Sequence, residues 1–313
     1  MRKRPVANVG ASIRQRLLTL AREQNEDFGL VLTRYAIERL LYRLSRSPHA
    51  DDFILKGAQL FTLWTETPHR TTRDLDLLCQ GSPALTRLET VFRDLCQQQV
   101  DASDGLAFRA DSVRAETIRE AAAYDGVRVL VEYELSGARD RLQIDVGFGD
   151  VVVPAPEMVA IPALLDLPAP QMMAYPMEAV VAEKYEAMVS LGMANSRMKD
   201  FYDVWILNQR FSFDGERLCQ AISATFSRRK TPLPSDVPAA LSSDFSADRD
   251  KQIQWRAFVR RSRLPAGVEL SDVIVALREF LMPPTAAIIA GEPFLMVWSP
   301  AAKWEPRPDR LAR

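Results

Sequence analysis

Carboxylates alternate with leucines in residues 72–78, which read Thr-Arg-Asp-Leu-Asp-Leu-Leu. Residues two apart in an extended strand point to the same face, so Asp74 and Asp76 share one face and Leu75 and Leu77 the other. This pattern restricts the segment to a strand that buries its leucine face. The opposite face predicts a clamp for a divalent cation, which phosphoryl transfer needs to offset the charge of a nucleoside triphosphate.

A glycine-containing turn precedes this strand. Phe53-Ile54-Leu55 reads as a short buried strand that enters Lys56-Gly57, and residues 58–65 are apolar enough for a helix. Gly57 allows close approach of the backbone to a phosphate, and the amides of a helix N-terminus bind anions. We expect Lys56, Gly57 and Ala58 to bind nucleotide, but the same pattern also suits a simple strand-to-helix turn.

A third carboxylate follows on a later strand. Residues 127–148 alternate in hydrophobicity on both sides of a turn expected at residues 136–140, which predicts an antiparallel hairpin. Asp145 on the inner face of this mostly apolar hairpin is costly unless it is paired or binds metal. A site for two Mg²⁺ ions is therefore predicted at Asp74, Asp76 and Asp145. The alternative for Asp74 and Asp76 is a solvated strand edge without function.

The wider pattern predicts an α+β chain with a small mixed sheet, helices, and a mainly helical C-terminal region. Six prolines within residues 154–176 indicate a largely extended connection after the sheet. Helical periodicity predicts helices at residues 12–46, 85–98, 176–191, 199–208 and 271–281. The tail from Pro283 is not expected to be strongly helical. We expect three domains, at residues 1–50, 51–155 and 156–313.

Arginines line one side of the first helical segment, at Arg34, Arg39, Arg43 and Arg46. A solvated face is the ordinary interpretation of such a stripe, and contact with RNA is the sharper one. Arg228 and Arg229 are further candidates for contact with an acceptor backbone.

Lys184 interrupts an otherwise apolar face of the helix predicted at residues 176–191. Its aliphatic stem could simply snorkel toward water, or its ammonium could bind phosphate in a cleft. Asp200 and Asp203 share a face of the next predicted helix with Arg197. They suit an ion-pair network, or an aspartate that pairs with Lys184 and orients it.

Composition limits the chemistry. The 313 residues include 40 basic and 41 acidic ones, and this balance neither demands nor excludes a nucleic-acid partner. With only two histidines, carboxylates must carry most of any catalysis. The three cysteines are widely spaced, which favours a reducing compartment over a disulfide framework. No signal peptide or transmembrane stretch is evident, so a cytoplasmic location away from membranes is expected.

Four motifs follow one another in the chain: Lys56-Gly57-Ala58, Arg70-x-Thr72-x-Asp74-Leu75-Asp76, Ala182-Glu183-Lys184 and Arg197-x-Lys199-Asp200-Phe201-Tyr202-Asp203. Together they resemble the AbiEii/AbiGii-type toxin nucleotidyltransferases, which include the mycobacterial MenT toxins. The resemblance covers roughly residues 10–300. It implies a DNA polymerase β-like nucleotidyltransferase core with a helical C-terminal region.

The resemblance also implies roles for single residues. Asp74 and Asp76 match the metal-binding aspartates, and Thr72 matches a hydroxyl position two residues before the first of them. Lys184 matches the lysine of the later motif, and Asp203 its acidic partner. The remaining nucleotide-binding residues that we expect are Lys56, Gly57, Ala58, Arg73 and Asp200. Ala58 departs from the glycine or serine of many members, which leaves only backbone contact with phosphate at that position.

By this resemblance the chain would be a cytoplasmic, Mg²⁺-dependent toxin of a toxin–antitoxin or phage-defence system. It would transfer a nucleotide from an NTP to an acceptor, such as the tRNA 3′ end that characterised relatives modify. An antitoxin encoded beside it is the expected partner. Two alternatives stay open: transfer to a small molecule or protein, and a nucleotide-binding module without catalysis.

Overall fold

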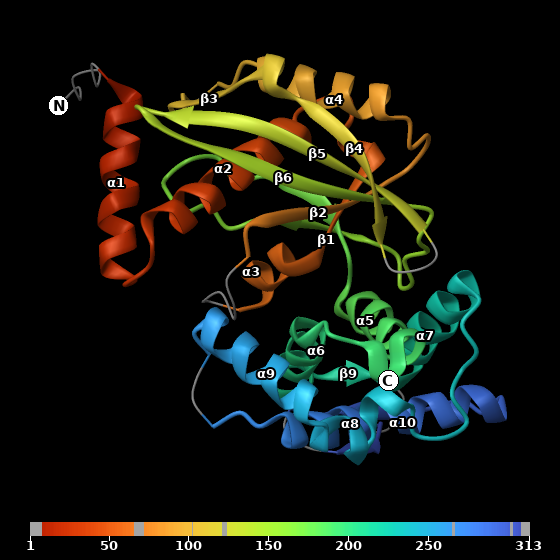
Figure 1. The fold of residues 1–313 in the computed structure, drawn as a ribbon. Coiled ribbons are helices and arrows are strands. Elements are labelled where there is room, and N and C mark those ends of the chain that lie inside the picture. Colours follow the sequence, from red (N-terminus) through yellow and green to blue (C-terminus); the bar gives the residue numbers. More distant parts are fainter. Residues whose placement is uncertain are drawn as a thin grey trace, which may run out of the picture. The chain divides into compact units, whose positions relative to one another are not determined.

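The structure is a computed structural model that describes residues 8–65, 72–101, 103–120, 124–264, 267–300 and 303–307. The chain divides into two compact units (Figure 1). The first comprises Met1–Gly149 and Glu157–Ala174, and the second comprises Asp150–Pro156 and Tyr175–Arg313. The three domains expected from the sequence stay a prediction.

The first unit is a mixed sheet with helices. Its helices are α1 (Val9–Glu23), α2 (Phe28–Ser45), the short α3 (Phe61–Trp64) and α4 (Leu85–Gln97). Its strands are β1 (Phe53–Lys56), β2 (Asp74–Cys79), β3 (Leu106–Phe108), β4 (Arg114–Glu120), β5 (Tyr124–Leu135), β6 (Ala138–Phe148), β7 (Glu157–Ala160) and β8 (Gln171–Ala174). The strand order is β3-β5-β6-β2-β1-β8-β7, with β4 paired to β5. The β2/β6 and β1/β8 pairs are parallel, and the other pairs are antiparallel.

The leucine face of β2 lies in the core, as the alternation predicts. Leu75 and Leu77 are fully buried. On the neighbouring strand β1, the ring of Phe53 packs edge-on against Phe92 of α4, with 6.2 Å between ring centroids. The opposite face of β2 is therefore the one that carries Asp74 and Asp76.

The helical pattern predicted over residues 12–46 is two helices rather than one. The break lies between α1 and α2, where Asn25 adopts a left-handed conformation with φ 52°. Asp27 then begins α2, because its side chain accepts a hydrogen bond from the amide of Leu30. Residues 22–27 are all polar, so the apolar periodicity is itself interrupted at this boundary.

The proline-rich connection contributes two strands to the sheet. β8 runs parallel to β1 at Leu55↔Ala174, and β7 pairs antiparallel with β8. Met172 and Ala174 are buried, so β8 inserts into the core in spite of the surrounding prolines. Residues 157–174, predicted as part of an extended connection, thus belong to the first unit.

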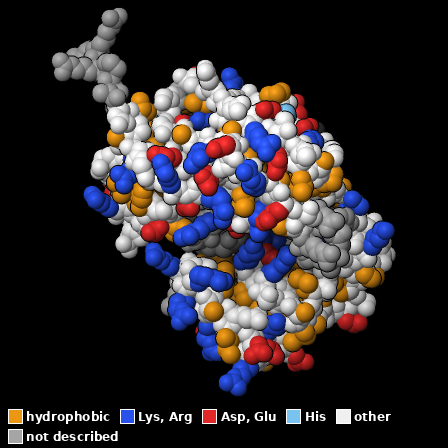
Figure 2. Space-filling model, turned by 45° about the horizontal axis from the view of Figure 1, so that its top comes forward, with side chains coloured by type: hydrophobic (Ala, Val, Ile, Leu, Met, Phe, Trp, Pro, Cys, Tyr) orange, Lys and Arg blue, Asp and Glu red, His pale blue; other side chains and the backbone are white. Residues whose placement is uncertain are grey.

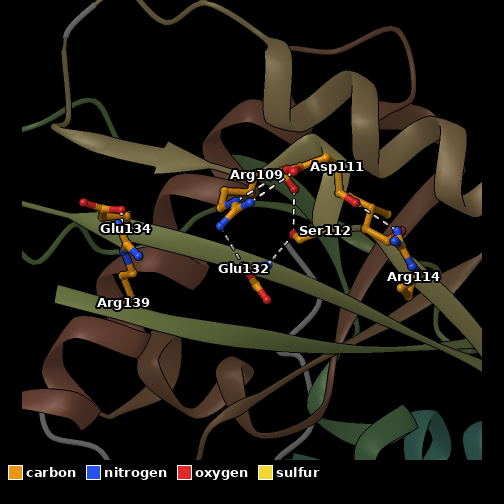
Figure 3. Close-up of polar contacts among 8 residues, drawn as sticks. Arg109, Asp111, Ser112, Arg114, Glu132, Glu134 and Arg139 are labelled. Carbon is orange, nitrogen blue, oxygen red and sulfur yellow. Dashed lines mark hydrogen bonds and ion pairs between the residues drawn. The ribbon is translucent and has the colours of Figure 1, made fainter. Parts of the chain in front are cut away.

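A network of surface contacts fixes the connection between β3 and β4 (Figure 3). The hydroxyl of Ser112 donates to the carbonyl oxygen of Arg109 at 2.6 Å and accepts from the amide of Glu132 on β5 at 2.9 Å. Arg109 also forms ion pairs with Asp111 and Glu132. Exposed pairs of this kind contribute little to stability, because solvent and salt screen them. The network therefore reads as surface structure and not as a functional site.

The second unit is mainly helical. Its helices are α5 (Met177–Leu191), α6 (Met198–Arg210), α7 (Gly215–Arg229), α8 (Ser243–Ala247), α9 (Arg249–Ser262) and α10 (Leu270–Ala290). A small sheet adds β9 (Phe213–Asp214), β10 (Met296–Trp298) and β11 (Trp304–Pro306), in the order β11-β10-β9.

Helix α10 runs through Pro283 and Pro284, so the expected loss of helix at Pro283 is wrong. A proline inside a helix removes a hydrogen bond and crowds the preceding turn. Burial of Leu281, Pro284 and Thr285 holds this stretch in place, and the Thr285 hydroxyl donates to the carbonyl oxygen of Leu281 at 2.7 Å. In the described part of the chain, α10 alone is long and apolar enough to cross a membrane. It packs against α6, α7 and α8 as a core helix of the second unit.

Candidate functional site

The strand register of the first unit places three charged side chains in one row. Lys56 on β1 is opposite Asp76 on β2, and Asp76 is opposite Asp145 on β6. Side chains at paired positions of adjacent strands share a face of the sheet. Asp74 lies on that face too, two residues before Asp76 and opposite Gln143. The sheet thus brings together Lys56, both aspartates of β2, and Asp145 on the hairpin strand β6.

Gly57 lies in direct contact with Asp76. Its φ is +75°, a conformation that side chains rarely adopt. A Cβ at Gly57 would lie 2.0 Å from Asp76 Oδ2 and 2.6 Å from Asp76 Cβ. The glycine therefore leaves the space that the Asp76 side chain fills. The turn thus contacts the Asp76 carboxylate directly, whereas the sequence predicts a contact between the turn and a phosphate.

Lys56 reaches across β2 toward β6. The side chain is buried, at 7% exposure, and a Cβ built on Gly147 would lie 3.0 Å from Lys56 Nζ. Gly147 is two residues beyond Asp145 and therefore faces the same side of the sheet. The ammonium thus lies beside the carboxylate row instead of in solvent.

Asp145 is held by an arginine that the sequence analysis did not single out. Arg128 on β5 is opposite Asp145, and its Nε and Nη2 donate to Asp145 Oδ1 and Oδ2 at 2.8 and 2.9 Å. The Gln143 amide donates to Asp145 Oδ2 at 3.2 Å. The hydrogen bonds to Asp145, with smaller effects from the charges of Asp145 and Asp74, raise the pKa of Arg128. Arg128 thus lies within electrostatic reach of Asp74 as well.

The donor set suits Mg²⁺, which prefers oxygen ligands and is usually held by one or two carboxylates together with substrate phosphates. Asp74 and Asp76 supply two such carboxylates on one strand face. Among the residues that the structure describes, no cluster of three His, Cys, Asp or Glu side chains could hold a metal ion. Asp145 is adjacent by register, but both of its oxygens are engaged by Arg128.

A second group of charges lies in the second unit. Lys184 on α5 contacts two carboxylates of α6, with Nζ 2.6 Å from Asp200 Oδ1 and 2.9 Å from Asp203 Oδ2. Both aspartates are buried, and Lys184 is largely so. The sequence left open which aspartate pairs with Lys184, and the structure pairs both. Lys184 is the cation that these two buried carboxylates share, and removal of one partner of a buried ion pair typically costs about 3–5 kcal/mol.

The other predicted nucleotide-binding residues differ in their exposure to solvent and in their contacts. Ala58 is buried, whereas Arg73 is exposed. The Thr72 hydroxyl donates to the backbone carbonyl oxygen of Asp74 at 3.4 Å. Arg70, the first residue of the same motif, lies outside the described residues.

The arginine stripe on α2 is not the solvated face suggested by the sequence. Arg39 and Arg43 are buried. Arg43 forms a bidentate pair with Asp104, and Arg39 pairs with Glu38 and donates to the carbonyl oxygen of Pro168. Neither is available to RNA, because burial in these pairs removes both from the surface.

Two further arginines proposed for acceptor contact are also engaged. Arg34 pairs with Glu26. Arg229 contacts Asp150, Glu183 and Glu186, and their charges raise its pKa. Both side chains are mostly shielded from solvent. Of the arginines suggested earlier for RNA, Arg46 and Arg228 remain exposed.

A mixed sheet with paired carboxylates on its central strand, followed by a helical region, is the architecture of a nucleotidyltransferase. The fold resembles that of a candidate nucleotidyltransferase from H. pylori, with a TM-score of 0.50 and 14% identity over 85% of this chain and 99% of that chain. The structure of JHP933 from Helicobacter pylori is also similar, at 15% identity over 81% of this chain and 90% of that chain. Its TM-score of 0.45 is too low to support an argument. No curated protein matches the sequence.

The family model of the AbiEii nucleotidyl transferase toxin, of type IV toxin–antitoxin systems, matches residues 39–272. The chain belongs to this family. The match confirms the resemblance inferred from the four motifs, and the fold confirms a DNA polymerase β-like core with a helical C-terminal region. The chain is thus a nucleotidyltransferase toxin by family.

Proposed function

We propose that this toxin is Mg²⁺-dependent and transfers a nucleoside monophosphate from an NTP to the 3′ end of tRNA in the cytoplasm. The observation that carries the proposal is the row on the sheet face, where Asp76 lies beside Lys56 and against Gly57, with Asp74 two residues away on the same face. Two carboxylates held by a rigid strand and a tight turn suit a metal-bound triphosphate. The tRNA acceptor rests on the family resemblance alone, and a role in phage defence is part of the same proposal.

In the proposed reaction, the acceptor hydroxyl oxygen attacks the α-phosphorus of the NTP. A new phosphate ester bond forms, the bond between the α-phosphorus and the bridging oxygen breaks, and pyrophosphate leaves. Mg²⁺, when bound, would neutralise charge on the phosphates. Asp74 and Asp76 would hold it, Asp145 would complete the site and take the hydroxyl proton, and Lys56 and the Gly57 backbone would bind phosphate.

Lys184 would neutralise phosphate charge, held by Asp200 and Asp203. The double ion pair supports this role by fixing the ammonium in one position. Thr72 would orient the start of β2 through its hydrogen bond to Asp74, and Arg73 and Ala58 would contribute to nucleotide binding.

Incubation of the purified chain with each labelled NTP, Mg²⁺ and total tRNA tests the proposal. We expect label on tRNA, located at the 3′ end by nuclease mapping, and none after addition of EDTA. Label on a small molecule or protein from a cell extract would replace tRNA as the acceptor. Nucleotide binding without transfer to any acceptor would instead identify a binding module.

The Arg128–Asp145 pair permits a test of Asp145 as a metal ligand. Asp145→Asn should lower kcat by about 100-fold or more, because the loss of a charged ligand removes several kcal/mol of transition-state stabilisation. Arg128→Ala should instead lower the Mg²⁺ concentration that gives half-maximal rate, because the arginine and the metal compete for the same oxygens. Equal losses in both variants, with an unchanged Mg²⁺ requirement, would show that Asp145 serves only to hold Arg128.

A further inference from the structure

Helix α9 has two faces of very different character. Its inner face buries Lys251, Trp255 and Phe258. Trp255 Nε1 donates to the carbonyl oxygen of Val268 at 2.8 Å, and Lys251 Nζ donates to that of Asn195 at 3.0 Å. These contacts anchor the helix in the second unit. The exposed residues on and just after the helix include five arginines, at Arg249, Arg256, Arg260, Arg261 and Arg263.

These five arginines lack ionic partners within the described part of the chain. No side-chain hydrogen bond or ion pair joins any of them to another described residue. Asp250 is the one acidic residue in the helix sequence. This sets the outer face of α9 apart from Arg39, Arg43 and Arg229, which are all paired.

Helix stability explains only part of this concentration of charge. Arg260 and Arg261 lie in the last turn, where cations interact favourably with the helix dipole. Arg249 lies in the first turn, where a cation is unfavourable, and Arg256 and Arg260 are like charges four residues apart. The helix dipole therefore accounts for Arg260 and Arg261 but not for Arg249 and Arg256, whose placement is that expected of a surface that binds an anionic partner.

An open groove of about 280 Å³ lies along this face. Three arginines, Arg256, Arg260 and Arg263, and one carboxylate, Glu269, line it together with apolar groups from Trp255, Val259 and Leu264. Guanidinium groups bind phosphate oxygens in a bidentate manner, and apolar surface between them accommodates bases and sugars. By helix geometry, Arg249 and Arg256 are about 10 Å apart along the axis, and Arg256 and Arg260 about 6 Å. Figure 2 shows Lys and Arg side chains gathered along the lower left flank, where Figure 1 places α9.

We propose that the outer face of α9, defined by Arg249, Arg256, Arg260, Arg261 and Arg263, binds the phosphate backbone of the RNA acceptor. This inference rests on the proposed function and assigns its acceptor a surface. The face exposes one large hydrophobic side chain, Ile253. A protein partner would need a more apolar centre to its interface, so charge complementarity favours a polyanionic backbone.

Helix α9 also packs on the helix that carries the buried aspartates. The ring of Tyr202 on α6 lies 5.8 Å from Phe258 and 6.5 Å from Trp255, centroid to centroid. Asp200 and Asp203 project from the same helix α6 to Lys184. RNA bound on α9 would therefore lie one helix away from the Lys184 group within the second unit.

The test compares Arg256→Ala/Arg260→Ala with Arg278→Ala/Lys303→Ala, which removes the same charge from elsewhere in the second unit. Arg256, Arg260 and Arg278 are helical, where alanine is favoured, and Lys303 is exposed before β11, so both variants should fold; thermal unfolding checks this. Binding of the full chain to fluorescent tRNA is measured by anisotropy from 50 to 200 mM KCl. Binding of NTP is measured separately, and a polyglutamate peptide serves as a competitor.

We expect the α9 variant to bind tRNA about tenfold more weakly at 100 mM KCl, with a salt slope smaller by about 1.4 for two lost phosphate contacts. The NTP affinities of the α9 variant and of the control variant should both equal that of the unsubstituted chain. Equal losses of tRNA binding in the two variants, or no loss in either, would overturn the assignment. Competition by polyglutamate as strong as by RNA would also overturn it, in favour of an acidic protein partner. Binding is measured without turnover. If the chain binds tRNA through α9 but transfers no label, the proposed function is refuted and the assignment of the α9 surface stands.

Discussion

Asp76→Asn is expected to abolish growth arrest in cells and to lower label transfer in vitro by at least about 1,000-fold. The amide has the shape of the carboxylate but lacks its charge, so it binds Mg²⁺ poorly. A bound metal contributes several kcal/mol to charge neutralisation during phosphoryl transfer, and each 1.36 kcal/mol corresponds to tenfold in rate. Because Asp76 occupies the centre of the row between Lys56 and Asp145, it should be the most sensitive position on the sheet.

The matched control for this variant is Asp111→Asn. Asp111 is an exposed carboxylate of the same unit and pairs with Arg109 on the surface (Figure 3). It undergoes the same change of charge and should keep full toxicity and transfer. Growth arrest by Asp76→Asn at unchanged protein level would refute metal-assisted transfer, and equal loss in Asp111→Asn would point to a general effect of charge on the fold.

The parts of the site that the sequence predicts well are those encoded by local patterns. Alternation over residues 72–78 is enough to place Asp74 and Asp76 opposite the buried leucines, because period two has one structural meaning in a half-buried strand. The Lys56-Gly57 turn is likewise local. The contact of Gly57 with Asp76 is different, because it arises only when β1 pairs with β2.

A hairpin turn of the correct length would have predicted from the sequence that Arg128 lies opposite Asp145. The hairpin turns at Ser136 and Gly137, both with positive φ, and Leu135 pairs with Ala138. Such a two-residue loop fixes the register, and counting back along both strands places Arg128 opposite Asp145. The turn predicted over residues 136–140 was too long, which hid this pair.

Burial of charge is the feature that sequence patterns predict least well here. Arg43 looks like part of a solvated stripe, but its partner Asp104 lies 61 residues away, and the carbonyl oxygen that Arg39 reaches is 129 residues away. Helix α9 is a second element that the sequence pattern does not predict. Only Lys251, Trp255 and Phe258 are buried, so its apolar stripe is too narrow to reveal the helix by periodicity.

Gly57→Ala is expected to lower transfer by about 100-fold or more without removing any charged group. The new methyl group would lie 2.6 Å from Asp76 Cβ, an atom that no side-chain rotation can move away, so either β1 or β2 must shift. The positive φ adds about 1–2 kcal/mol of strain for a residue with a side chain. Displacement of Asp76 by a fraction of an ångström is enough to misplace a metal-bound phosphate, because catalytic groups must be held within about 0.5 Å.

Two other glycines separate the causes of that loss. Gly137 also has a positive φ, but a Cβ there would meet nothing within 4 Å, so Gly137→Ala should lose stability and keep activity. Gly147 has an ordinary φ, and the one tight contact of a Cβ there would be the flexible end of Lys56, at 3.0 Å from Nζ, so Gly147→Ala should have a mild effect on NTP affinity. Thermal unfolding and transfer rates of the three variants are compared at equal concentration. If Gly57→Ala loses no more activity than Gly137→Ala, strain alone accounts for its effect, and the contact between the turn and Asp76 does not set the geometry of the site.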